Sequence, residues 1–327
     1  MKKTDWSIRS EKLQMLDSVA RIQRQYSFLD DYRYALSKDL PTVKAAISKY
    51  GAALRKPLLR FFAGDILEEV AHAAHDQFLK SLVKYIKAGK LTVNSRVSDR
   101  LLESLRVQVI GNIDALIAGA DLDMRARAYE FKTVAAESAQ AVLVAQTQMT
   151  QLKIESITRR TTDAEDLQKA WIKLQKKYGG TDTVKYRNGA HYPLNVYLDQ
   201  RANTTATDLH VATTQFDAST SGVYTGKIST HGASDSCRPW EGKMVFFTSE
   251  GRDILSKKYP NTSTWKTVGE IKADKNTHLW KFNCTHGITP YPIQFFDESD
   301  AEQEINESNT PTAKQLAKAD AEYRASA

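Results

Sequence analysis

Apolar side chains recur every three or four positions over much of the first 180 residues, which is the spacing of amphipathic helices. In the clearest run, between Pro57 and Gly89, the apolar positions are Leu58, Phe61, Phe62, Ile66, Val70, Phe78, Leu82 and Tyr85. We expect one or two helices there, starting at Pro57 and ending at Gly89. Upstream, Asp39 precedes Leu40 and Pro41, an order typical of a helix start, because proline is tolerated in the first turn.

A second group of predicted helices lies between residues 98 and 178. Ser98 and Asp99 can cap a helix, and residues 121–157 contain neither Gly nor Pro, so they predict one helix about 55 Å long. Residues 133–151 are rich in Ala, Val and Gln, which favours close packing on helices of the same chain or of another copy. Thr161–Glu165 then predicts a cap for a helix that reaches Lys177 and ends before Gly179.

The pattern changes after residue 180, where most of the prolines and histidines of the chain lie. Short β-type runs occur at 183–186, 224–230 and 243–248, and a helix is expected over about 193–214. We therefore predict an α+β chain, with a large N-terminal helical region over 1–180 that forms a helical bundle with a long helix. A small α+β domain over 181–296 and an acidic polar tail over 297–327 follow, and the tail is either disordered or ordered by a partner.

The net charge of +7 is distributed unevenly along the chain. Residues 1–100 hold 19 basic and 11 acidic side chains, whereas the last 37 residues hold 3 and 8. A basic end can contact nucleic acid or an acidic protein surface, although a solvated helical face accounts for the same pattern. No apolar run reaches the roughly 18 residues of a membrane span, and neither a secretory signal nor a disulfide framework is visible. We expect a protein kept in a reducing cytosol.

Four possible ligands of a soft metal lie in the predicted small domain, namely His231, Cys237, Cys284 and His286. Two cysteines and two histidines suit tetrahedral zinc, and Cys284 and His286 would share one face of an extended strand. The spacing matches no standard zinc finger, so buried thiols and hydrogen-bonded histidines are the alternative. The only cofactor that the sequence leaves open is thus a structural zinc ion.

Signatures of known enzymes are weak. The sequence has no phosphate-binding loop, no dinucleotide-binding fingerprint and no HExxH pair, and the residues around Cys237 match no known cysteine nucleophile. One pattern resembles the Arg, Ser-Thr-Ser and Glu-x-Glu elements of ADP-ribosyltransferases, through Arg201, residues 219–221, and Glu302 with Glu304. The glutamate pair falls in the polar tail, where little would hold a catalytic carboxylate rigidly. We expect no catalytic residues, and the transferase stays an alternative.

Three stretches occur in the order of a known family: YPLNVYLDQRANTT at 192–205, HGASDSCRPWEGKMVFF at 231–247 and NCTHGITPY at 283–291. Together they resemble the phage minor capsid protein 2 family, which is related to the head-morphogenesis proteins of Mu-like phages. The resemblance covers about residues 180–296, and its motif positions are Tyr197, Arg201, Thr205, Arg238, Pro239, Trp240 and Gly242. Family members often carry a further cysteine and histidine where this chain has Ser234 and Lys281, which weakens the zinc hypothesis.

The resemblance implies a minor structural protein of a tailed bacteriophage head, at the portal vertex inside the capsid, which aids head assembly, genome packaging or DNA passage. Its partners would be the portal protein, the major capsid protein and packaged double-stranded DNA, and several copies would surround the portal. It would be found in the virion, and in the host cytoplasm during assembly. A head-carried transferase and a non-specific DNA-binding packaging factor are the alternatives.

Overall fold

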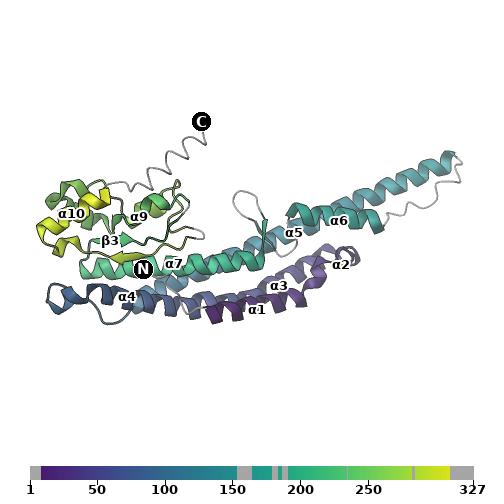
Figure 1. Ribbon diagram of the computed structural model, residues 1–327. Coiled ribbons are helices and arrows are strands. Elements are labelled where there is room, and N and C mark those ends of the chain that lie inside the picture. Colours follow the sequence, from purple (N-terminus) through teal and green to yellow (C-terminus); the bar gives the residue numbers. More distant parts are fainter. Residues whose placement is uncertain are drawn as a thin grey trace, which may run out of the picture. The chain divides into compact units, whose positions relative to one another are not determined.

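The computed structural model describes residues 9–152, 164–178, 183–185, 191–233, 235–281 and 284–309 (Figure 1). Helices dominate, and a small strand region follows the long N-terminal helices, which confirms the α+β prediction. The chain forms two compact units. Unit 1 combines Phe62–Gln108 with the described residues from Gln200 onward, and unit 2 combines Glu11–Phe61 with the described residues of Val109–Asp199. Each unit thus draws on both sides of the expected boundary at residue 180.

Unit 2 is built mainly from helices. They are α1 Arg9–Gln25, the 3-10 turn η1 Ser27–Asp30, α2 Tyr32–Ser37, α3 Leu40–Leu59, the later part of α5 and α6 Ala164–Tyr178. The strands β1 Thr183–Lys185 and β2 His191–Pro193 pair antiparallel. Trp171 of α6 stacks edge-on against Phe131 with ring centroids 4.8 Å apart, and its indole N–H donates to the carbonyl of Asp30 over 3.0 Å.

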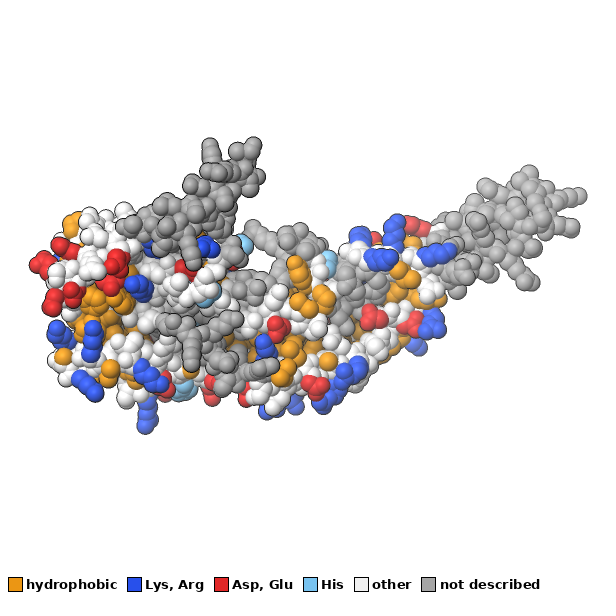
Figure 2. Space-filling model, in the orientation of Figure 1, with side chains coloured by type: hydrophobic (Ala, Val, Ile, Leu, Met, Phe, Trp, Pro, Cys, Tyr) orange, Lys and Arg blue, Asp and Glu red, His pale blue; other side chains and the backbone are white. Residues whose placement is uncertain are grey.

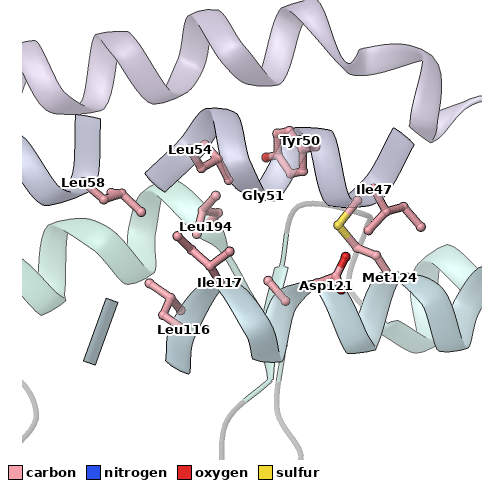
Figure 3. A pocket seen from close by; sticks show the side chains of 11 residues that line it. Ile47, Tyr50, Gly51, Leu54, Leu58, Leu116, Ile117, Asp121, Met124 and Leu194 are labelled. Carbon is pink, nitrogen blue, oxygen red and sulfur yellow. The ribbon is translucent and has the colours of Figure 1, made fainter. Parts of the chain in front are cut away.

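Helix α3 packs closely on α5 within unit 2 (Figure 3). A Cβ atom added at Gly51 would lie 3.1 Å from Ile117 Cγ2, so glycine allows this approach of the two helices. A narrow apolar pocket remains beside the contact, lined from α3 by Ile47, Tyr50, Leu54 and Leu58 and from α5 by Leu116, Ile117 and Met124. Its walls are almost entirely apolar, which identifies it as a packing gap in the core.

Two predicted helix starts have different outcomes. Asp39 caps α3 as expected, because its carboxylate accepts the backbone N–H of Thr42 over 2.7 Å. The predicted start at Pro57 is wrong, since Pro57 lies in the last turns of α3. A π-helical turn, η2 Arg60–Asp65, then leads into α4 Ile66–Lys87. Pro57 removes only one backbone donor from α3, and Leu54 and Leu58 on either side of it stay buried.

Helix α5, Asp99–Leu152, joins two segments that were predicted as separate helices. Ser98 accepts the N–H of Leu101 as expected, but Gly111 and Gly119 do not interrupt the helix. A glycine inside a helix costs about 1 kcal/mol, and burial of the regularly spaced Leu101, Leu105, Val109 and Ile113 outweighs that cost. The side chains of residues 138–152 lie outside those described, and so does most of the packing expected for 133–151.

Unit 1 contains a three-stranded antiparallel sheet in the order β4-β3-β5. The strands are β3 Thr225–Ile228, β4 Met244–Phe246 and β5 Ile288–Pro290; the last was not predicted. One core cluster joins Phe78 and Leu82 of α4 and Val211 of α7, Leu194–Ser221, to Ile228 and Ile288 of the sheet. The remaining elements are η3 Arg238–Trp240, α8 Ser249–Lys258, η4 Pro260–Thr262, α9 Val268–Ala273, η5 Ile293–Phe295 and α10 Glu298–Asn309.

Helix α10 corrects the prediction for the start of the polar tail. Ala301 and Ile305 are buried four residues apart, against a cluster that includes Trp265. The backbone N–H of Met244 donates to Ser308 Oγ over 2.9 Å. Residues 298–309 therefore pack on their own chain, through an apolar helical face and polar contacts such as Lys227 with Glu304. Residues 310–327 lie outside the described part.

None of the helices in the described ranges is long and apolar enough to span a bilayer.

Candidate metal centre

Three of the four predicted metal ligands meet in unit 1. Cys237 Sγ, Cys284 Sγ and a ring nitrogen of His286 all lie within 4.8 Å of one another. His286 Nδ1 is 3.4 Å from Cys284 Sγ. Both cysteines are reduced and buried, and His286 is only 2% exposed. The group therefore lies inside the fold, where two loops of unit 1 come together.

Cys237 is placed by the loop between β3 and β4. Its backbone N–H donates to the carboxylate of Asp235 over 2.9 Å, and its carbonyl accepts the N–H of Trp240 in the turn η3. Arg238 Nη1 donates to the carbonyl of Ala233 over 3.1 Å. Gly242 then adopts a φ of +73°, a conformation that glycine accepts at little cost, and leads the chain into β4. The stretch 238–242 thus forms a turn fixed at several points.

Cys284 and His286 are placed by the segment that enters β5. Thr207 of α7 donates from Oγ1 to the carbonyl of Cys284 over 2.9 Å. The backbone N–H of His286 points at Cys284 Sγ over 3.4 Å, and the indole N–H of Trp280 donates to the carbonyl of His286 over 3.0 Å. These contacts hold the backbone on both sides of the thiol, so its position is set by the fold.

The opposite edge of the His286 ring faces a carboxylate. His286 Nε2 is 3.3 Å from Glu241 Oε1, which also accepts the backbone N–H groups of His231 and Ala233, each over 2.9 Å. The His231 ring lies against the His286 ring with centroids 3.9 Å apart, and its Nε2 is 3.4 Å from Thr285 Oγ1. His231 therefore groups with Glu241 and His286, and its ring covers one face of the His286 ring.

The cluster is strongly polarised. The neighbouring Cys237 thiol, helped by His286, lowers the pKa of Cys284. Cys284 and burial raise the pKa of Cys237 in turn. Burial opposes protonation of His286, but Cys284 and then Glu241 outweigh it and raise the pKa of His286. For Glu241, burial is outweighed by the N–H groups of Ala233 and His231, which lower its pKa.

Glu241 is the functional candidate that the sequence reasoning missed. It stands inside the stretch 231–247, in which the sequence predicts metal ligands only at His231 and Cys237. Histidines that bind metals commonly donate their second ring nitrogen to a carboxylate. A glutamate four residues from a candidate cysteine, in a chain with candidate histidines, was therefore the available signal.

The other motif positions lie apart from the cluster or support it. Tyr197, Arg201 and Thr205 all belong to α7, and Thr205 is buried. Pro239 lies in the first turn of η3. The Trp240 ring faces Lys266 Nζ at 5.6 Å from its centroid.

The transferase-like elements do not converge. Arg201 and Thr220 lie on the same helix, α7, and at 1.5 Å per residue they are about 28 Å apart. Glu304 of α10 is engaged by Lys227 Nζ over 3.1 Å and by the Tyr291 hydroxyl over 2.5 Å. No common site brings these side chains together in the described structure, so the pattern receives no support from geometry.

Basic side chains of the N-terminal third are interspersed with acidic ones (Figure 2). Arg55 pairs with Asp114 over 2.7 Å, and Arg106 pairs with Glu68 and Glu103. Acidic side chains thus lie next to basic ones in this region, which weakens the case for a continuous nucleic-acid surface.

The fold class is α+β, with a helical unit and a unit in which helices pack on a small antiparallel sheet. In comparisons with known proteins, the chain matches no protein-family model, no curated protein and no solved structure. The likeness to the phage minor capsid protein 2 family therefore rests on the three sequence stretches alone and stays a prediction.

Proposed function

We propose that the protein is a minor structural protein of a tailed bacteriophage head, bound at the portal vertex inside the capsid. One observation carries this proposal: the stretches 231–247 and 284–291 fold onto each other. They contribute β4 and β5 on either side of β3, and Cys237 of the first meets Cys284 and His286 of the second. Short matches that keep the order of a family and also meet in space are more informative than isolated matches.

Unit 2 offers a surface for the protein partner. Leu122 and Tyr129 on α5 are 67% and 62% exposed, and their separation of seven residues places them on one helical face. Large exposed apolar side chains that share a face are typical of protein contacts. We assign this face to the portal protein, around which several copies would bind.

The proposal is tested by incorporation into heads. A phage that encodes the chain is grown, and DNA-free heads assembled with or without portal protein are compared by quantitative mass spectrometry. We expect a low copy number in heads that contain portal and loss of the protein from heads that lack it. Presence in DNA-free heads separates portal binding from DNA binding, because a DNA-dependent protein would be missing from them.

Three variants test the assigned face. Leu122→Ser and Tyr129→Ser, each made singly, should reduce incorporation. Leu13→Ser is the control: it removes one exposed apolar side chain from α1, 57% exposed, and should leave incorporation unchanged. Absence of the wild-type protein from purified heads would refute the proposed function. Equal incorporation of all three variants would refute the assigned face.

A further inference from the structure

We propose that Cys237, Cys284 and His286 bind one Zn²⁺ ion, that Glu241 positions His286 for this role, and that water takes the fourth coordination place. The inference concerns the folding of unit 1 and does not depend on a phage function. It also changes the ligand set that the sequence predicted, since it excludes His231 and adds Glu241 behind a ligand.

The distances already fit a zinc site. Zinc binds thiolate sulfur at about 2.3 Å and imidazole nitrogen at about 2.0–2.1 Å in tetrahedral geometry, so a sulfur and a nitrogen ligand lie about 3.6 Å apart. Cys284 Sγ and His286 Nδ1 are 3.4 Å apart, and Cys237 Sγ lies within 4.8 Å of both. The three atoms are therefore close enough for one ion to bind all of them after small side-chain adjustments.

Glu241 completes the environment that a histidine ligand needs. When Nδ1 binds the metal, Nε2 carries the proton and must donate it. Glu241 Oε1 lies 3.3 Å from Nε2 and is itself held by the backbone N–H groups of His231 and Ala233. The carboxylate is thus placed to fix the tautomer and the orientation of His286 before any metal arrives.

His231 stands outside the proposed ligand set. Its ring stacks on His286 and belongs to the group on the Glu241 side, whereas the thiols lie on the Nδ1 side of His286. Its exposed position also differs from that of the three buried ligands. His231 therefore shields the Glu241–His286 contact, and its removal should spare the metal.

Charge favours the filled site. Two thiolates and a neutral imidazole around Zn²⁺ sum to zero, which suits residues as buried as Cys237 and Cys284, 2% and 6% exposed. The ion would also join the β3–β4 loop to the segment that enters β5. Such a crosslink stabilises the contact between these two loops, because metal binding free energy adds to folding free energy.

Metal analysis of the full-length protein tests the inference. The wild-type chain, purified under reducing conditions and equilibrated with Zn²⁺, should retain one zinc ion per chain after dialysis. Its Co²⁺ form should show tetrahedral d–d bands and a thiolate-to-cobalt charge-transfer band. This spectrum needs no variant, so it decides the question even where a cysteine variant does not fold. Absence of stoichiometric metal, or a Co²⁺ spectrum without thiolate bands, would overturn the proposal.

Variants then test each role. Cys237→Ser and Cys284→Ser should lose the zinc, and Glu241→Gln should weaken zinc binding about 10- to 100-fold in competition with a chelating dye. His231→Asn is the matched control and should keep one ion with unchanged affinity. Zinc that remains in the cysteine variants, or a loss in His231→Asn as complete as in Cys284→Ser, would overturn the ligand assignment.

Discussion

The buried hydrogen bond between His75 on α4 and Asp217 on α7 joins two parts of unit 1 that are 142 residues apart in sequence. His75 Nδ1 lies 2.8 Å from Asp217 Oδ2, and the two side chains are 3% and 6% exposed. Burial raises the pKa of Asp217, while His75 acts in the opposite direction. Removal of either partner leaves the other polar group buried without its main contact.

The expected loss is large for that reason. Removal of one partner leaves the other buried polar group unsatisfied, which costs about 1–3 kcal/mol and more for a carboxylate. Asp217→Ala and His75→Ala should therefore each lower the free energy of unfolding by about 3 kcal/mol. Asp217→Asn keeps an acceptor for a neutral imidazole and should cost only about 1–2 kcal/mol. In the double variant the two losses should not add, and the coupling free energy should reach about 1–3 kcal/mol.

Urea unfolding followed by near-ultraviolet circular dichroism measures these free energies for the wild type, the two single variants and the double variant. The pair Arg55–Asp114 is the matched control, because its side chains are 47% and 45% exposed and solvent screens their interaction. The same cycle there should give a coupling close to zero. Additive losses at His75 and Asp217, or an Asp217→Ala variant as stable as Asp114→Ala, would refute the placement of α4 against α7.

Three further predictions test other parts of the fold by urea unfolding. Gly226→Ala should lower the free energy of unfolding by about 1–3 kcal/mol, because the added Cβ would lie 2.6 Å from Phe247 Cζ. Gly111→Ala, whose added Cβ would meet open space, should raise it by about 0.4–1 kcal/mol. Equal effects of the two variants would contradict the packing around β3. Ile305→Ala should cost about 2–5 kcal/mol if α10 is docked, and no loss would mean that it is not. Burial lowers the pKa of His210 from 6.5 to about 4. Below about pH 6.5 the unfolded chain therefore binds more protons than the folded chain. The buried His210 should lower the free energy of unfolding by about 2 kcal/mol at about pH 5 relative to about pH 7. In His210→Asn this dependence of the free energy of unfolding on pH should become weaker.

Local signals in the sequence predicted much of the fold. Asp39 and Ser98 cap helices because capping depends on a side chain and on backbone only two or three residues away. Pro57 was misleading, since a proline that usually starts a helix can also lie in its last turns when flanking residues such as Leu58 stay buried. The docking of helix α10 was not predicted, because Ala301 and Ile305 alone are a weak sign of an amphipathic helix. The cluster around Trp265 that buries them is formed by other parts of the chain.

The candidate site was predictable in composition but not in geometry. Residue type alone predicted Cys237, Cys284 and His286 as metal ligands, because thiols and imidazoles are rare and bind soft metals. Whether His231 is a fourth ligand depends on the side of the His286 ring on which it lies. The thiol of Cys284 is next to Nδ1, whereas His231 groups with Glu241, which is next to Nε2. That arrangement is set by contacts across tens of residues, such as the one between Thr207 and Cys284, which no local pattern specifies.

The pairing of β3 with β5 explains why the cysteines meet. The two strands run antiparallel with Ile228 opposite Ile288, so the residues that follow β3 must lie beside those that precede β5. Ser229 and Gly287 exchange two hydrogen bonds at this point. A slip of one residue would turn every side chain of β5 to the other face of the sheet and would carry His286 away from Cys237. Metal binding at the cluster would therefore report the register of the sheet, and zinc would stabilise the same pairing that brings the two family-like stretches together.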